Sequence, residues 1–245
     1  MGLMGKDENG MNAKHEGEGS MQIQSAIFDI DGTLVDSNDA HAHAWVRALA
    51  EYGYNVSFEK VRPLIGMGGD KVLPEVAGIS KESEEGQKIS KLRKQIFLQE
   101  YLPHVRAFPG AVELLMRLRK QGLRLAIATS AEQDELQKLL AVIDPHAGDF
   151  FEQISSSKDA QQSKPDPDVI QATLQRTGFD PARTIMFGDT PYDIEAAGKA
   201  GVKTIAFRCG GWSDKDLRGA LAIYNDPADL LQHYEESPLV KGIYP

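Results

Sequence analysis

Residues 27–33 read Ile-Phe-Asp-Ile-Asp-Gly-Thr, a short apolar run that ends in two carboxylates and a turn. The run over 25–30 is rich in isoleucine and flanked by polar residues, which predicts a buried parallel strand. Ligands of open α/β sheets bind just beyond the carboxyl ends of the strands, and residues two apart share a face. Asp29 and Asp31 therefore mark a candidate active site, with two aspartates that merely cap a strand end as the alternative.

The composition is typical of a globular protein and excludes several classes of function. The 245 residues are 41% hydrophobic and 26% charged, enough for a sizeable core in one large α/β domain or in a core with an insertion. No run approaches the length of a membrane span, so we expect no membrane partner. The net charge of -9 argues against a nucleic-acid partner, because phosphate backbones are held by clustered Lys and Arg.

Two further features concern the compartment and the amino terminus. Cys209 is the single cysteine, so no intrachain disulfide forms, and a reducing cytoplasm is the expected location. Residues 1–20 are rich in Gly, Glu and Lys and lack an apolar segment, which predicts a flexible tail rather than a secretory signal.

Strand and helix patterns alternate along most of the chain, except for one helical block. Helical patterns cover 39–52, 57–64, 71–77 and 82–100, with Asn38 or Asp39 as the first cap, and no strand is predicted between 38 and 103. We therefore expect an α/β fold, a three-layer Rossmann-like parallel sheet core formed by 21–36 and 105–245, with an inserted α-helical cap domain at 37–104. The predicted strands are 25–30, 123–128, 150–154, 185–187, 203–207 and 221–223.

Polar side chains follow several of these strands, and a lysine joins them from a loop. Carboxylates gathered in one cleft repel each other unless a cation neutralises them. Oxygen ligands favour Mg²⁺, and no His or Cys cluster among these positions indicates zinc. Such a site suits phosphoryl transfer, which depends on positioning and charge neutralisation. The residues are Asp29, Asp31, Thr129, Ser130, Lys164, Asp189 and Asp193.

Four segments carry a resemblance to a known family. They are 29–33 (Asp-Ile-Asp-Gly-Thr), 129–130 (Thr-Ser), 164–167 (Lys-Pro-Asp-Pro) and 188–193 (Gly-Asp-Thr-Pro-Tyr-Asp). In this order and spacing they resemble the motifs of the haloacid dehalogenase-like hydrolases, over residues 23–231. The helical insertion after the first segment resembles the cap of the subgroup that contains phosphoglycolate phosphatase and β-phosphoglucomutase. The resemblance implies a central first strand and a cap that closes over the site.

The resemblance also implies the roles of the catalytic side chains. Asp29 would attack phosphorus to form an aspartyl-phosphate, and Asp31 would protonate the leaving alkoxide and then activate water. Ser130, or Thr129, would hydrogen-bond the transferred phosphoryl group, and Lys164 would neutralise its charge. Family dehalogenases lack this pair of aspartates, so the second one favours phosphatase chemistry.

The implied metal site collects acids from both strand ends. Asp189 would bind Mg²⁺ together with an Asp29 oxygen and the Asp31 backbone carbonyl. Asp193 would be a further ligand or an acid that orients the others. An acid in the first turn of a helix also stabilises the helix dipole without any metal, which remains the alternative for Asp193.

Substrate contacts are predicted both beside the acids and in the cap. Gly32 allows a sharp turn and close backbone approach, Thr33 adds a hydroxyl, and Ala131 completes the set on the core side. In the cap, His41 lies ten residues past Asp31 and resembles the cap histidine of the phosphomutase pattern.

The cap residues also separate two activities. His41 shares a helical face with Trp45, and packing of both into the seam between cap and core is the alternative reading. Gly69 and Lys71 lie in a glycine-rich segment that resembles the substrate loop. The mutase pattern has an arginine at Gly69 and an acid at Gly188, so these two differences favour a phosphatase.

Together these features predict a Mg²⁺-dependent phosphatase that hydrolyses a small phosphorylated metabolite of the phosphoglycolate or sugar phosphate type. The alternative enzyme is a β-phosphoglucomutase-like sugar phosphomutase, and a non-catalytic binding module on the same fold is the third option. The expected partner is a small-molecule phosphate ester, and the expected state is a monomer or dimer. Hinges near 35–38 and 103–108 would let the cap open and close.

Overall fold

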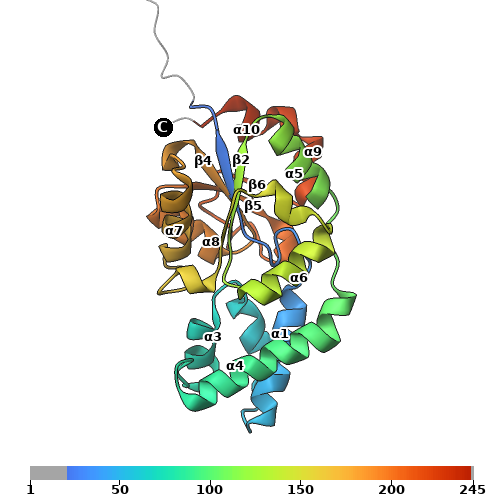
Figure 1. Ribbon diagram of the computed structural model, residues 1–245, viewed down its shortest axis with the longest axis vertical. Helices are drawn as coiled ribbons and strands as arrows, with labels where there is room; N and C mark the ends of the chain where they lie inside the picture. Colours follow the sequence, from blue (N-terminus) through green and yellow to red (C-terminus); the bar gives the residue numbers. More distant parts are fainter. Residues whose placement is uncertain (1–20, 244–245) are drawn as a thin grey trace, which may run out of the picture.

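The computed structural model describes residues 21–243, so the predicted tail at 1–20 lies outside the described residues. Six parallel strands form one sheet in the order β3-β2-β1-β4-β5-β6 (Figure 1). Helices cover both faces of the sheet, so the predicted three-layer α/β fold is confirmed. The strands are β1 (Ser25–Phe28), β2 (Arg124–Ala128), β3 (Gln153–Ser155), β4 (Thr184–Gly188), β5 (Lys203–Phe207) and β6 (Ala222–Tyr224).

Strand β1 lies at the centre because every one of its side chains is buried. It pairs in parallel with β2 on one side and β4 on the other, and Ser25 aligns with Arg124 and with Thr184. The chain order reverses between β1 and β4, which is the place where doubly wound sheets bind ligands beyond their strand ends. The acids that follow β1 are therefore held at the switch point of the sheet.

Two apolar layers pack on opposite faces of the sheet. Ile27 faces a layer formed with α7 (Asp168–Thr177) and α8 (Pro191–Lys199). Phe28 faces the larger layer, which includes α5 (Ala111–Lys120), α6 (Gln133–Ile143) and α9 (Pro227–Gln232). Neighbouring residues of β1 thus serve opposite faces, as a strand period of two requires. A short helix, α10 (Pro238–Lys241), follows these.

The third strand differs from its predicted position. Residues 147–150 form a 3₁₀ turn, and the strand begins only at Gln153. Phe151 is buried and packs edge-on against Phe28, with 6.0 Å between ring centroids. Phe151 thus packs in the core from the end of a turn. A pattern of hydrophobic residues cannot distinguish this arrangement from a short strand.

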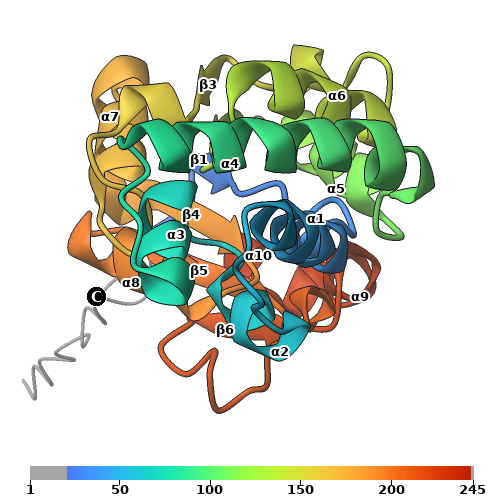
Figure 2. The same ribbon diagram turned by 90° about the horizontal axis from the view of Figure 1, so that it is seen from below.

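Helices fill the segment between β1 and α5, all of it described, and it contains no strand, only the isolated bridges Asp31–Val35, Val35–Ala107 and Ile65–Met67. These helices lie below the sheet in Figure 1 and across it when the molecule is seen from below in Figure 2. The predicted helix at 57–64 is split by a 3₁₀ turn at Pro63, and the one at 82–100 ends in a π-helical turn. The elements are α1 (Asn38–Glu51), α2 (Phe58–Val61), α3 (Gly69–Ala77) and α4 (Glu84–Ile96).

The two chain segments that enter and leave this helical part run side by side. Val35 forms an antiparallel bridge with Ala107, and the Asp36 N–H donates to the Arg106 carbonyl over 2.9 Å. The predicted boundaries of core and cap at 36/37 and 104/105 fall at this paired connection and stay predictions. Within residues 21–243, every helix is too short or too polar to cross a membrane.

Phe28→Ala tests the central packing of β1. Phe28 is fully buried and stacks on Phe187 with 4.5 Å between centroids, so its truncation leaves a cavity against the sheet. We expect the free energy of unfolding to fall by about 3–5 kcal/mol. Equilibrium urea unfolding measures it, with Met116→Ala at an exposed position of α5 as the control. A loss under about 1 kcal/mol would contradict the packing described here.

Candidate active site

Three carboxylates meet where β1 and β4 end. Asp29 follows β1, Asp189 follows β4, and Asp193 lies in the first turn of α8. One oxygen from each lies within 4.8 Å of the others, and all three side chains are buried. The sequence prediction that these acids share one place is thus matched by the geometry.

Lys164 is the cation inside this cluster. Its Nζ lies 2.7 Å from Asp29 Oδ1 and 2.8 Å from Asp193 Oδ1, and the side chain is buried. Burial opposes the charged form of a lysine, but the carboxylates of Asp193 and Asp29 outweigh it and raise the pKa of Lys164. The lysine therefore stays charged and ties the loop before α7 to both strand ends.

One lysine does not balance three acids. Burial, with the charges of Asp193 and Asp31, raises the pKa of Asp29 to about 7, although Lys164 opposes this. Burial, with Asp193 and Asp29, also raises the pKa of Asp189 well above its ordinary value. A cluster of oxygen donors with this excess negative charge fits a hard divalent cation such as Mg²⁺.

Asp189 is held by two side-chain hydrogen bonds and by close contact with two glycines. Thr33 Oγ1 donates to Oδ1 over 2.9 Å, and Asn38 Nδ2 donates to Oδ2 over 2.9 Å. A Cβ added at Gly210 would stand 1.8 Å from Oδ2, and one at Gly32 would stand 2.3 Å from it. Gly32 also has φ +76°, a conformation that favours glycine. Gly32 and Thr33, predicted for substrate contacts, thus lie against Asp189, and their substrate role stays a prediction.

Asn38 corrects the expected start of α1. Ser37 occupies the cap position without a side-chain cap bond, and Asn38 is the first helical residue. Its amide reaches Asp189 and also donates to the Gly210 carbonyl over 3.2 Å. Asp39 does not cap the helix either, because its carboxylate pairs with Arg62 over 2.5 Å.

Both carboxylate oxygens of Asp193 contact other residues of the protein. Oδ1 faces Lys164, while Oδ2 accepts from the Thr190 hydroxyl over 2.7 Å and from the Thr190 N–H over 3.1 Å. The Asp193 N–H donates to Thr190 Oγ1 over 3.2 Å, which completes a capping box at the start of α8. This arrangement orients Lys164, and direct metal ligation by Asp193 stays a prediction.

Asp31 lies on the side of the site nearest the helical part. It accepts from Ser37 Oγ over 2.5 Å and lies 2.8 Å from His41 Nε2. Burial alone would raise the pKa of Asp31, but the neighbouring His41, Ser37 and Arg93 together lower it below its ordinary value. His41 also stacks on Phe97 with 3.9 Å between centroids, so it both packs in the seam and contacts the acid.

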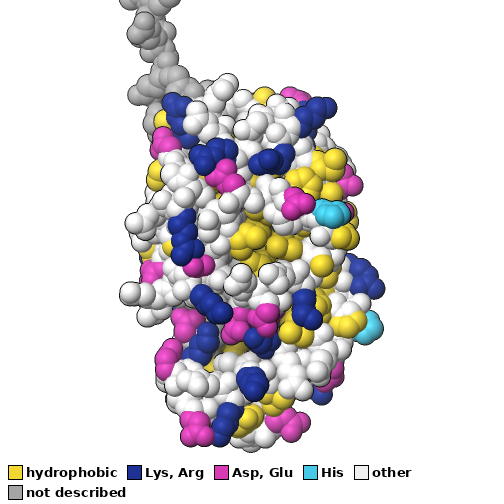
Figure 3. All heavy atoms as spheres, viewed as in Figure 1, with side chains coloured by type: hydrophobic (Ala, Val, Ile, Leu, Met, Phe, Trp, Pro, Cys, Tyr) yellow, Lys and Arg dark blue, Asp and Glu magenta, His cyan; other side chains and the backbone are white. Residues whose placement is uncertain are grey.

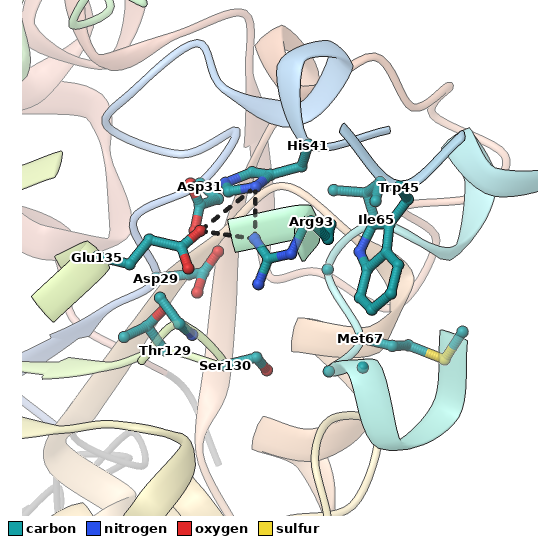
Figure 4. A pocket seen from close by; sticks show the side chains of 14 residues that line it. Asp29, Asp31, His41, Trp45, Ile65, Met67, Arg93, Thr129, Ser130 and Glu135 are labelled. Carbon is teal, nitrogen blue, oxygen red and sulfur yellow. Dashed lines mark hydrogen bonds and ion pairs between the residues drawn. The ribbon is translucent and has the colours of Figure 1, made fainter. Parts of the chain in front are cut away.

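A pocket opens between the acids and the helices above them (Figure 4). Thr129, Ser130 and Ala131 line its core side, and Gly69 lines the other. Ser130 Oγ is buried, with no hydrogen-bond partner among the described residues. Lys71 does not line this pocket, because its amine pairs with Asp166 on the core, so its predicted substrate contact is not brought to the site.

Residues 26–207 match the sequence model of the haloacid dehalogenase-like hydrolases. The chain belongs to this family. Protein CbbY of Rhodobacter capsulatus is 30% identical over 82% of this chain and 96% of its own length. A phosphoglycolate phosphatase of Rhodospirillum rubrum is 29% identical over 84% of this chain and 89% of its own. A hydrolase from Pseudomonas syringae has a structure with TM-score 0.80 and 31% identity, covering 87% of this chain and 98% of that one. The family resemblance read from the four motifs is confirmed.

Sequence reasoning missed two charged residues of this haloacid dehalogenase-like hydrolase. Arg93 of α4 and Glu135 of α6 line the pocket, and Arg93 Nη1 donates to Glu135 Oε1 over 2.8 Å. Arg93 stands four residues after the buried Ile89, and Glu135 stands four before the buried Leu139. A charge on the apolar stripe of a helix was the available signal, because such a residue needs a buried partner.

The acid cluster predicts a stability response to Mg²⁺. We expect Mg²⁺ to raise the Tm of the wild-type hydrolase. At one hundred times the Kd, binding adds about 2.7 kcal/mol to the free energy of unfolding, which corresponds to a rise in Tm of roughly 5–10 °C. Asp189→Asn should remove this shift because it takes one charge out of the cluster. Asp149→Asn, at an exposed position, is the control that should keep it. Differential scanning fluorimetry with and without chelator measures the effect, and an equal shift in Asp189→Asn would refute the assignment.

Proposed function

We propose that this hydrolase is a Mg²⁺-dependent phosphatase that cleaves small phosphate esters through an aspartyl-phosphate. The observation that carries the proposal is the pairing of two unlike acids in one pocket. Asp29 is bound to Lys164 and lies with Asp189, whereas Asp31 is bound to His41 from the other side. The two carboxylates thus have different partners, a lysine for Asp29 and a histidine for Asp31, which suits a nucleophile and a proton carrier.

Asp29, Asp189 and the backbone carbonyl of Asp31 are the groups that would hold the cation. When bound, Mg²⁺ supplies positive charge to the phosphoryl oxygens and to the carboxylates around it. Asp193 supports this site by fixing Lys164. A cation held there would lower the pKa of Asp29 and so favour its carboxylate form, which a nucleophile needs.

In the first step, the Asp29 carboxylate attacks phosphorus and the bond to the ester oxygen breaks. Asp31 gives its proton to the departing alkoxide, while Thr129, Ser130 and Lys164 bind the phosphoryl oxygens. In the second step, Asp31 takes a proton from water, the hydroxide attacks phosphorus, and Asp29 is released with inorganic phosphate. A substrate phosphate placed beside Asp31 favours its protonated form, which counters the low pKa of the free site.

Two positions favour a phosphatase over a mutase. A Cβ at Gly69 would lie 3.2 Å from the Trp45 ring, so the ring crowds the place where the mutase pattern has an arginine. A Cβ at Gly188 would lie 2.5 Å from Asp193 Cβ, which leaves no space for the acid of that pattern. Water, rather than a second phosphorylated sugar, is then the acceptor of the phosphoryl group.

Asp29→Asn tests the proposed nucleophile. An amide cannot form the acyl-phosphate, so we expect release of phosphate from a generic aryl phosphate to fall by roughly 10⁴-fold or more. Asp36→Asn, an exposed acid in the connection before α1, is the matched control and should retain activity. A colorimetric phosphate assay with Mg²⁺ measures both variants. Substantial activity in Asp29→Asn would overturn the mechanism, and isomer formation without phosphate release would indicate a mutase.

A further inference from the structure

The pocket holds a charge pair to which the proposed reaction assigns no step, although Arg93 lowers the pKa of Asp31 and Glu135 Oε1 lies 3.6 Å from His41 Nδ1. Arg93 comes from α4 and Glu135 from α6, and Figure 4 shows their side chains pointing toward each other beside His41. Glu135 is almost fully buried, with 1% of its side chain exposed, and Arg93 has 14% exposed. The pair therefore lies inside the seam, within the pocket where a substrate's leaving group would sit above the phosphate.

Positive charge at this place is fully balanced. Of the described residues that line the pocket, Arg93 is the one lysine or arginine, and Glu135 neutralises it. Lys94, the next residue along α4, pairs instead with Glu132 over 2.7 Å and Asp134 over 3.1 Å, outside this pocket. On the face drawn in Figure 3, basic and acidic side chains lie next to one another at several places. A second anionic group placed beside Arg93 would thus meet the buried Glu135 carboxylate, whereas Lys81 lines a neighbouring cavity that shares Thr129 and Ser130 with this pocket.

The same pair leaves two polar atoms unsatisfied. Glu135 Oε2 is a buried acceptor and Arg93 Nε is a buried donor, and neither has a hydrogen-bond partner among the described residues. A hydroxyl group donates and accepts, so it can serve both kinds of atom. A carboxylate or phosphate only accepts, so it would satisfy Arg93 and be repelled by Glu135.

The rest of the wall is suited to a carbon skeleton. Trp45, Ile65 and Met67 line this side of the pocket, and the Arg93 guanidinium lies 5.3 Å from the centroid of the Trp45 ring. The ring is thereby fixed as an apolar surface next to the charge pair. Hydroxylated carbon chains combine C–H faces with groups that donate and accept, which matches this wall.

We propose that Arg93, Glu135 and Trp45 form a leaving-group subsite that selects phosphate monoesters of neutral polyols or sugars and rejects leaving groups with a second anion. This inference rests on the proposed phosphatase function and names its substrate class. Glu135 is the specificity-determining residue, because its charge excludes the second anion. The relative named phosphoglycolate phosphatase sets a contrast, since that substrate carries a carboxylate.

The test compares kcat/KM for glycerol 1-phosphate and for 2-phosphoglycolate, with Mg²⁺ present. We expect the wild type to favour glycerol 1-phosphate. Glu135→Gln keeps the shape of the side chain and removes its charge, so we expect the ratio of phosphoglycolate to glycerol phosphate activity to rise roughly tenfold or more. Taking the ratio cancels any effect that acts on both substrates through His41 and Asp31.

Glu132→Gln is the matched control, because it removes an acid of the same seam that pairs with Lys94 outside the pocket. It should change both activities alike. Arg93→Gln is a second variant, expected to lower activity on glycerol 1-phosphate without improving the anionic substrate. Thermal unfolding of each variant checks that it is folded.

The outcomes separate the two levels of the proposal. A wild type that favours phosphoglycolate, or a ratio that does not move in Glu135→Gln, overturns the subsite and leaves the phosphatase function standing. A wild type that releases no phosphate from either ester, or from an aryl phosphate, overturns the proposed function and the subsite with it.

Discussion

Three buried carboxylates around one buried lysine are the constraint on which this structure depends. The parallel sheet places Asp29 and Asp189 at neighbouring strand ends, and the loop before α7 delivers Lys164 between Asp29 and Asp193. Ionising these acids in a buried place opposes folding. Because the pKa of Asp29 is raised from 3.8 to about 7, its favourable contribution to stability is present below pH 4 and is lost as the pH rises through 7. A cation held among these acids at neutral pH would offset this loss and would link the stability of the fold to the proposed chemistry.

The helical part between β1 and α5 forms the other half of the site. His41 of α1 contacts Asp31, and Arg93 of α4 donates a hydrogen bond to Glu135 of α6. Lys71 and Asp166 form a further ion pair across the same seam. These contacts join two parts of the molecule that the chain connects through one pair of adjacent segments. Opening the seam would separate Asp31 from His41 and Glu135 from Arg93.

Much of the core could be predicted from the sequence, because local patterns carry it. Apolar runs that end in Asp, Thr or Gly-Asp identify strand ends, and parallel strands bring those ends together. The third strand begins later than predicted because residues 147–150 form a 3₁₀ turn and Phe151, which follows it, packs on Phe28.

Pairings between distant residues could not be predicted in this way. Asn38 or Asp39 was expected to cap α1, yet Asn38 donates to Asp189, which is 151 residues away. Lys71 was expected to contact the substrate, yet its amine forms an ion pair with Asp166. The pairing of Arg93 with Glu135 likewise depends on how α4 and α6 lie relative to each other.

The most direct test of the central constraint is calorimetric titration of the metal-free protein with Mg²⁺ at pH 7, in two buffers of different ionisation enthalpy. The raised acid pKa values predict net release of protons on binding, decreasing as the pH is raised. Binding without proton release at pH 7 would contradict the account.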